Sequence, residues 1–132
     1  MKILIVEDSF LTREILKDSL SPFGDCTIAV NGEEAIQAFE MALANKKPYD
    51  LICLDIRMPV MDGNQALVKI RELEKKAGIS LANEVKVIMT TACDDPKTVV
   101  NSYYRGGATS YLVKPFDEET LLKEVQKLGL GL

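Results

Sequence analysis

The sequence predicts an α/β fold: a doubly wound sheet of five parallel strands with helices on both faces. Short runs rich in β-branched residues alternate five times with longer segments of helical period, which is typical of successive βαβ units. Several of the short runs are apolar without alternation, as expected for strands that helices cover on both sides. A chain of 132 residues that is 47% hydrophobic fits one domain with one substantial core.

The predicted strands are five apolar runs. They cover residues 2–6, 26–30, 51–54, 85–90 and 110–113. The run at 51–54 is apolar throughout and is followed directly by Asp55. A carboxylate at the end of a buried strand needs a partner or a chemical role, because ionised groups are rarely buried alone.

The first two helices are predicted from caps and apolar stripes. Asp8 or Ser9 could cap the first turn of a helix whose inward stripe is Leu11, Ile15, Leu16, Leu20 and Phe23. Asn31 precedes the second helix, and Glu34 stands at the reciprocal capping position. The inward face of this second helix is Ala35, Phe39 and Ala42.

The remaining helices follow the third, fourth and fifth strands. The third begins near Gly63 or Asn64 and carries Leu67, Ile70 and Leu73, while residues 75–84 are its end and a loop. The fourth opens at Asp95-Pro96, carries Val99, Val100 and Tyr103, and stops at Gly106-Gly107. The last opens at Asp117, with Leu121, Val125 and Leu128 inward.

Composition excludes several classes of function. A net charge of -4 and a pI near 4.9 argue against direct binding to nucleic acid or anionic lipid. No apolar stretch reaches membrane-spanning length and the N-terminal run is too short for a secretory signal, so we expect a cytoplasmic protein. The three cysteines lack a C-x-x-C spacing and the chain has no histidine, which favours reduced structural thiols over a zinc site.

Polar side chains follow four of the five predicted strands. Glu7 and Asp8 follow the first, Asp55 the third, Thr91 the fourth and Lys114 the fifth. If the strand order is 2-1-3-4-5, the flavodoxin-like order, the first and third strands flank the point where the order reverses, and ligands bind there. The three carboxylates would then converge on one cleft, with a hydroxyl and an ammonium on its far wall.

This arrangement predicts metal-assisted phosphoryl chemistry. Three close carboxylates repel one another and raise at least one pKa unless a cation lies between them. Oxygen ligands without sulfur or imidazole suit Mg²⁺. Mg²⁺ and Lys114 would offset the repulsion between Asp55 and a phosphoryl group, and aspartate is an established nucleophile for forming an acyl phosphate.

Each of these residues also has an ordinary explanation. Glu7 and Asp8 could form a solvated loop or a helix cap, and Asp55 a turn before Pro59. Thr91 could be an ordinary strand residue and Lys114 an exposed strand end. Their shared place at the carboxyl ends of strands favours the functional interpretation.

The stretches "ILIVEDS", "LDIRMPVMDG", "VIMTTA" and "YLVKPF" together resemble the receiver domain of two-component response regulators, over nearly the whole chain. The resemblance implies that Asp55 accepts a phosphoryl group from a sensor histidine kinase or phosphotransfer protein. It implies that Mg²⁺ is held by Glu7, Asp8, Asp55 and the backbone carbonyl of Arg57. It also implies that Thr91 and Lys114 bind the phosphoryl oxygens, and that Lys114-Pro115 is a cis peptide.

The resemblance further implies a signalling output and no enzyme activity beyond the domain's own phosphorylation and dephosphorylation. Thr91 and Tyr111 fall at the family's switch positions, and the face made by the fourth helix, fifth strand and fifth helix would bind a downstream target protein or a second copy in a phosphorylation-dependent dimer. We expect residues 1–132 to form a single receiver domain with no output domain. Arg57 and Cys93 flank the expected path of the hydrolytic water, which leaves the lifetime of the phosphoryl group open.

Three other families share part of this pattern. A phosphatase of the haloacid dehalogenase type needs a second aspartate where Arg57 stands. A flavodoxin-like nucleotide binder needs a phosphate loop rich in Ser, Thr or Gly after the first strand, where this chain has "EDS". A pseudo-receiver, which binds partners without being phosphorylated, remains the open alternative.

Overall fold

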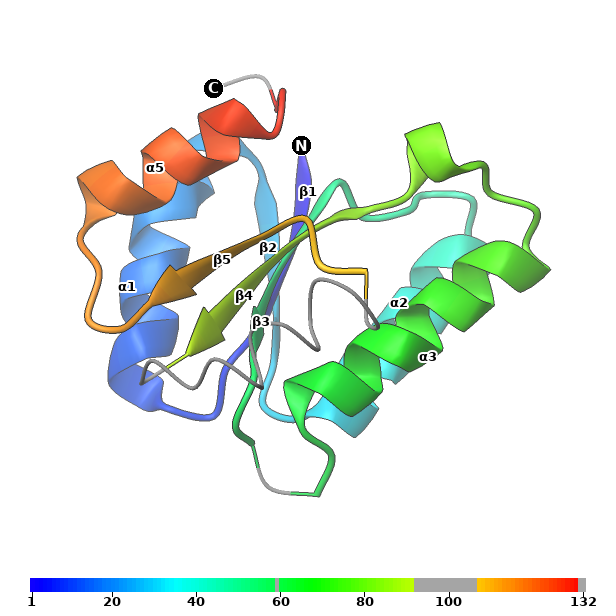
Figure 1. Cartoon of the computed structure of the whole chain (residues 1–132), viewed down its shortest axis with the longest axis horizontal. Helices are drawn as coiled ribbons and strands as arrows, with labels where there is room; N and C mark the ends of the chain where they lie inside the picture. The colour runs from blue at the N-terminus through cyan, green and yellow to red at the C-terminus, as the bar shows by residue number, and fades with distance from the viewer. Residues whose placement is uncertain (59, 92–106, 131–132) are drawn as a thin grey trace.

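The computed structural model describes residues 1–58, 60–91 and 107–130. All five strands are parallel, in the order β2-β1-β3-β4-β5, which confirms the predicted fold class and strand order. Helices α1 and α5 lie on one face of the sheet, and α2 and α3 lie on the other (Figure 1). Within this part of the chain, no helix is long and apolar enough to cross a membrane.

The strands lie close to the predicted runs. They are β1 Lys2–Val6, β2 Asp25–Ala29, β3 Leu51–Asp55, β4 Lys86–Thr91 and β5 Ser110–Val113. The first and last match the predicted ranges, and the other three differ by one residue at one or both ends, as strand boundaries commonly do. One consequence matters for the site: Asp55 and Thr91 are the last residues of β3 and β4 and do not belong to the loops that follow.

The helices are α1 Phe10–Leu20, α2 Gly32–Ala44, α3 Gly63–Lys76 and α5 Glu118–Lys127, with 3₁₀ turns at Ser21–Phe23 and Leu81–Asn83. The segment 75–84, predicted as the end of a helix and a loop, contains the end of α3 and the second of these turns. The fourth helix predicted from Asp95-Pro96, with Val99, Val100, Tyr103 and Gly106, lies outside the described residues.

Two predicted caps are confirmed. The Asn31 carboxamide oxygen accepts a hydrogen bond from the backbone N–H of Glu34 at 2.9 Å, and Asp117 accepts one from Thr120 at 2.8 Å. The Glu34 carboxylate reaches back to the backbone N–H of Val30 at 3.1 Å, one residue before the cap. Both helix starts are therefore fixed by their own side chains.

The other two helices begin where they were predicted, α1 just after Ser9 and α3 at Gly63, but their capping hydrogen bonds differ from the prediction. Asp62 caps α3 and forms a reciprocal pair of hydrogen bonds with Gln65, at 2.8 and 3.2 Å, and this capping pair was not predicted. Ser9 occupies the cap position of α1, but its side chain makes no capping hydrogen bond. Its backbone N–H instead donates to a carboxylate oxygen of Glu7 at 3.2 Å, so the start of α1 is tied to the candidate site.

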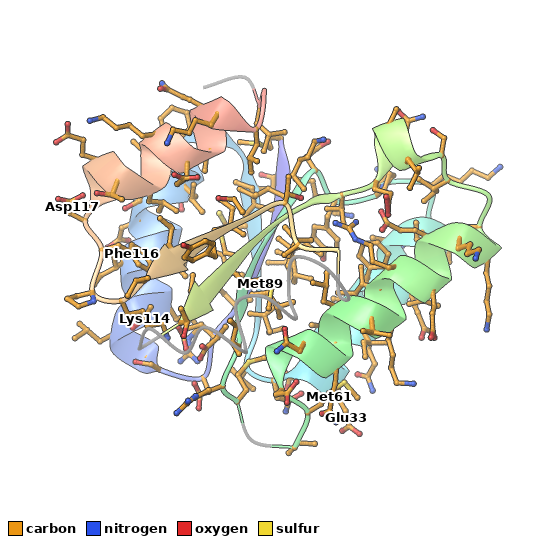
Figure 2. All side chains as sticks on the ribbon, viewed as in Figure 1. Glu33, Met61, Met89, Lys114, Phe116 and Asp117 are labelled. Carbon is orange, nitrogen blue, oxygen red and sulfur yellow. The ribbon has the colours of Figure 1, made fainter. Side chains whose placement is uncertain are left out.

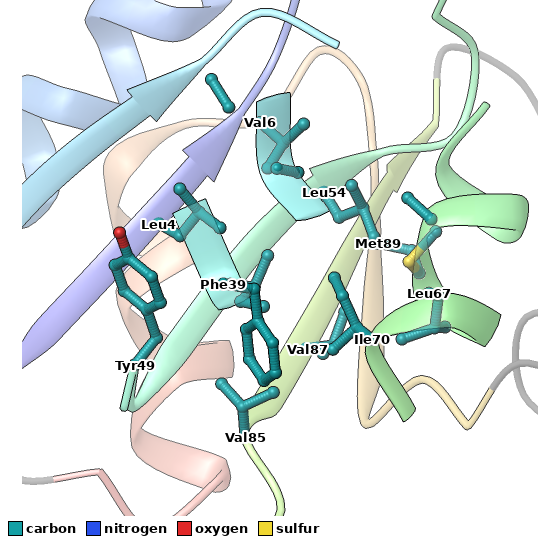
Figure 3. Packing of buried hydrophobic residues seen from close by; sticks show 14 of the residues in the cluster. Leu4, Val6, Phe39, Tyr49, Leu54, Leu67, Ile70, Val85, Val87 and Met89 are labelled. Atoms are coloured by element: carbon teal, nitrogen blue, oxygen red, sulfur yellow. The ribbon is translucent and has the colours of Figure 1, made fainter. Parts of the chain in front are cut away.

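The core has two parts, one on each side of the sheet. Alternate residues of β1 serve both, because successive strand side chains point to opposite faces. The larger cluster packs the sheet against α2 and α3 (Figure 3) and includes Leu4, Val6, Phe39, Leu54, Leu67, Ile70, Val87 and Met89. The smaller cluster packs it against α1 and α5 and includes Ile3, Ile5, Leu16, Leu20, Leu121 and Val125.

The predicted inward stripe of α1 is wrong in part. Leu16 and Leu20 are buried, but Leu11 is 71% exposed and Ile15 40% exposed. The physical reason is the helical period: neighbouring residues such as Ile15 and Leu16 lie about 100° apart around the axis. The apolar residues of α1 therefore form two stripes, and only one of them faces the sheet.

Candidate functional site

The fold brings the predicted polar residues to one edge of the sheet. Glu7 follows β1 and Asp55 ends β3, and these strands are neighbours with Val6 opposite Leu54. Lys114 follows β5, where its backbone N–H donates to the carbonyl of Thr91 at 2.7 Å. Figure 2 shows Lys114 at the end of β5. The parallel sheet thus brings four positions that are distant in sequence to the same end of the strands.

The loop between β3 and α3 folds back tightly onto Asp55. The backbone N–H of Gly63 donates to the carbonyl of Ile56 at 2.8 Å. A Cβ atom at Gly63 would collide with the backbone carbonyl of Asp55, so only glycine permits this approach. The backbone N–H of Arg57 donates to Asp55 Oδ1 at 3.3 Å. The loop therefore packs against the Asp55 backbone and holds one oxygen of its carboxyl group.

Three carboxylates form a cluster that could hold a metal ion. One oxygen from each of Glu7, Asp8 and Asp55 lies within 4.8 Å of the others. Glu7 is fully buried and Asp55 is 4% exposed, whereas Asp8 is exposed. A set of oxygen donors with one side open to solvent suits a hard divalent cation that keeps some of its water.

Lys114 was predicted to lie on the far wall of the cleft, but its ammonium group contacts the carboxylates directly. Its Nζ lies 2.5 Å from Glu7 Oε1 and 3.4 Å from Asp55 Oδ2. Glu7 is therefore held by the Lys114 ammonium on one oxygen and by the backbone N–H of Ser9 on the other. The ammonium remains within reach of the Asp55 carboxyl group.

The proximity of the acids shifts their protonation in opposite directions. Burial, and then the neighbouring Glu7, raise the pKa of Asp55 to about 7. Burial alone would also raise the pKa of Glu7, but its hydrogen bond with Asp55 and the Lys114 ammonium outweigh burial and hold its pKa below the ordinary value. The predicted rise of at least one carboxyl pKa is confirmed, and the two carboxyl groups share a hydrogen bond when Asp55 is protonated.

The structure also bears on the positions predicted for Thr91, Tyr111 and the Lys114-Pro115 peptide. Thr91, 1% exposed, is buried at the end of β4 beside Lys114. Tyr111 lies on β5 with a side chain that is 39% exposed. The Lys114-Pro115 peptide is cis, as predicted. Cys93 lies outside the described residues.

A hollow beside the acidic cluster was not foreseen. It has a volume of about 390 Å³ and is lined by Leu11, Thr12, Ile15, Lys114, Pro115 and Phe116. Phe10, at the start of α1, is 67% exposed. The available signal was the pair Leu11 and Ile15, which were predicted as part of a single stripe with Leu16 and Leu20.

Comparison with known proteins agrees with this geometry. The sequence profile of the response regulator receiver domain matches residues 3–126. The CheY chemotaxis protein of Listeria monocytogenes is 34% identical over 129 residues, which cover 96% of this chain and 97% of that protein. The probable transcriptional regulator ycf29 of Porphyra purpurea is 36% identical over 125 residues; the chain spans only 54% of its length.

The fold comparison gives the same result. The structure of the Vibrio cholerae chemotaxis protein CheY4 is 31% identical and covers 96% of both chains, with a TM-score of 0.75. Members of this family are signalling modules that accept a phosphoryl group on an aspartate. The family match spans nearly the whole chain and the strand order, acidic cluster and strand-end lysine accompany it. The chain therefore belongs to the receiver domains of two-component response regulators.

Proposed function

We propose that Asp55 is the residue of this receiver domain that accepts the phosphoryl group, from a phosphohistidine of a sensor histidine kinase or phosphotransfer protein. The observation that carries the proposal is the convergence of Glu7, Asp8 and Lys114 on one buried carboxyl group. An aspartate in the middle of such a cluster can be ionised when a divalent cation binds and can then act as a nucleophile.

The chemistry follows from the positions of the side chains. An oxygen of ionised Asp55 attacks phosphorus, the new O–P bond forms as the N–P bond of the donor breaks, and the imidazole keeps the electron pair and takes up a proton. Lys114, 3.4 Å from Asp55, would neutralise the transferred group, and Thr91, buried at the end of β4, would donate its hydroxyl to a phosphoryl oxygen. Bound Mg²⁺ would supply the remaining positive charge. The same residues would serve the domain's own dephosphorylation.

Asp8, Asp55, Glu7 and the backbone carbonyl of Arg57 are the proposed Mg²⁺ ligands. Asp8 and Asp55 would contribute most, because Glu7 is already held by Lys114 and the backbone N–H of Ser9. A group with these partners can interact with a hydrated cation through water without losing them.

The hollow beside Lys114 supports approach of the donor from the side of α1. Leu11, Ile15 and Phe116 offer apolar surface next to the carboxyl group that is to be phosphorylated. A partner that presents a phosphohistidine from an amphipathic helix could cover this surface as it transfers the group. This surface supports a histidine kinase or phosphotransfer protein as the donor, and a small phosphodonor could use the same carboxyl group.

The output is a shift between two conformations. Phosphorylation adds negative charge and oxygen acceptors, so Thr91 and Lys114 gain contacts that exist only in the modified state, and this difference can move the equilibrium. Tyr111 on β5 would change its packing with them, altering the surface of β5 and α5 that binds a downstream protein or a second copy in a dimer. We propose that this signalling takes place in the cytoplasm.

Labelling by acetyl phosphate in the presence of Mg²⁺ tests the proposal. The wild-type chain and the Asp18→Asn variant, which changes an exposed carboxylate of α1, should be labelled equally. Asp55→Asn should not be labelled. Labelling of that variant, or an acid-stable phosphate on the wild type, would contradict the assignment; no labelling of any variant would favour a pseudo-receiver.

A further inference from the structure

A second polar cluster, which is partly buried, lies at the opposite ends of the strands from the acidic cluster. The Arg71 guanidinium, on α3, donates from Nε and Nη2 to the carbonyl of Gly107 at 3.1 and 2.8 Å. Its Nη1 donates to the carbonyl of Val85 at 2.9 Å and to Glu74 Oε1 at 2.7 Å. One side chain thus binds α3, the start of β4 and the segment that leads into β5.

Glu74 completes this cluster. It is 2% exposed, and its second oxygen accepts a hydrogen bond from the backbone N–H of Val85 at 2.7 Å. A buried ion pair is a poor source of net stability, because removing two charges from water offsets much of their attraction. An ion pair with this many directed hydrogen bonds instead fixes the relative position of the segments that it joins, because each hydrogen bond weakens when its geometry changes.

The strand that receives this support is short and lies at the edge of the sheet. Among the described residues, β5 pairs with β4, the Ser110 hydroxyl donates to Glu124 Oε2 of α5 at 2.6 Å, and Ser110 and Leu112 are its buried residues. Just before it, Thr109 exchanges two hydrogen bonds of 2.9 Å with Val87. A strand with one large inward apolar side chain depends on such polar contacts for its placement.

The segment entering β5 is shaped to meet Arg71. In Figure 1 this segment is the short yellow stretch that leads directly into β5. Gly107 has a φ of 76°, in the left-handed region that favours glycine, and a Cβ atom there would lie 3.2 Å from Arg71 Nε. The absence of a side chain at Gly107 therefore lets the guanidinium reach the backbone carbonyl closely.

We propose that Arg71 is a positioning residue for Lys114, acting through β5. Lys114 lies seven residues beyond Gly107, which is roughly 23 Å along an extended strand, so Arg71 does not touch the phosphoryl site. Because Arg71 and Glu74 fix where β5 begins, they determine where Lys114 stands when the strand ends. The inference rests on the proposed role of Lys114 in phosphoryl transfer.

The experiment compares labelling by acetyl phosphate with Mg²⁺ affinity measured by titration calorimetry. Arg71→Gln should slow labelling at saturating Mg²⁺ by about fivefold, since displaced catalytic groups cost rate steeply. Its Mg²⁺ affinity should stay within about twofold of the wild type, because the proposed ligands lie on β1, β3 and their loops. The matched control is Lys69→Gln, which removes an exposed charge from the same helix and should change neither quantity.

A double-mutant cycle separates this inference from a general loss of structure. In a Lys114→Gln background, Arg71→Gln should slow labelling no further, because the group that it positions is already gone. An equal slowing in both backgrounds would overturn the inference while leaving the role of Lys114 intact. Unchanged labelling of Lys114→Gln alone would instead contradict the proposed function.

A second variant covers the case in which Arg71→Gln fails to fold because Glu74 is left buried without its partner. The double change Arg71→Gln with Glu74→Gln removes both charges and should show the same slowing. Hydrogen exchange should then be faster at the backbone amides of Thr109 and Ser110, with exchange at Ile5 in β1 unchanged. Normal labelling by this folded variant would overturn the inference.

Discussion

The raised pKa of Asp55 predicts an unusual pH dependence of stability for the metal-free protein. The pKa is about 7 in the folded chain against an ordinary value of 3.8. Between these values the folded state binds a proton that the unfolded state has lost, so the free energy of unfolding should fall as pH rises from about 4 to about 7. The difference of 3.2 pH units, at about 1.36 kcal/mol each, sets an upper limit of about 4 kcal/mol.

Asp55→Asn tests this reasoning, because the amide keeps the shape of the group and cannot ionise. Above pH 7.5 the variant should be more stable than the wild type by up to about 4 kcal/mol, and the advantage should shrink as pH falls toward 5. The pKa of Glu7 is lowered in the folded chain. The stability that ionised Glu7 contributes is therefore lost only as the pH falls below the ordinary pKa range of a glutamate, which is below the pH range of this test.

The assay is urea denaturation in chelator at a series of pH values from 5 to 8, with Asp18→Asn as the exposed control. Mg²⁺ added at pH 8 should remove most of the difference in free energy of unfolding between the wild type and Asp55→Asn. At pH 6, binding of each Mg²⁺ should release close to one proton. Wild type and Asp55→Asn curves that stay parallel from pH 5 to pH 8 would refute the proposed sharing of a proton between Asp55 and Glu7.

Three further outcomes are expected. Asp8→Asn should weaken Mg²⁺ binding more than Glu7→Gln does in a calorimetric titration, because Glu7 is held by other groups; the reverse order would mean that the two roles are exchanged. Val60→Asn should raise the free energy of unfolding by about 1 kcal/mol, because Val60 has a φ of 72° and is 75% exposed, so strain is relieved and no packing is lost; a less stable variant would contradict this. Beryllofluoride should change the NMR signals of Tyr111 and of residues 95–105, and changes restricted to the phosphoryl site would argue against the proposed coupling.

Much of the fold was determined by local chemistry that the sequence displays directly. Residues 2–6 and 110–113 were identified as strands because short apolar runs between polar turns have few other stable conformations. The caps at Asn31 and Asp117 were predictable because a capping side chain bonds to backbone only three residues away. The gathering of Glu7, Asp55 and Lys114 followed from the same logic, since parallel strands that end in polar residues must place them at one edge.

Tertiary structure alone decided which of these groups pair and which surfaces remain exposed. The contact between Lys114 and Glu7 joins positions 107 residues apart, and nothing local to either residue specifies a distance of 2.5 Å. The exposure of Leu11 and the hydrogen bonds of Arg71 with the Gly107 carbonyl likewise depend on where whole helices pack. The periodicity of a sequence shows which face of a helix is apolar. Which element covers that face, and which of its residues are buried, is decided by long-range packing.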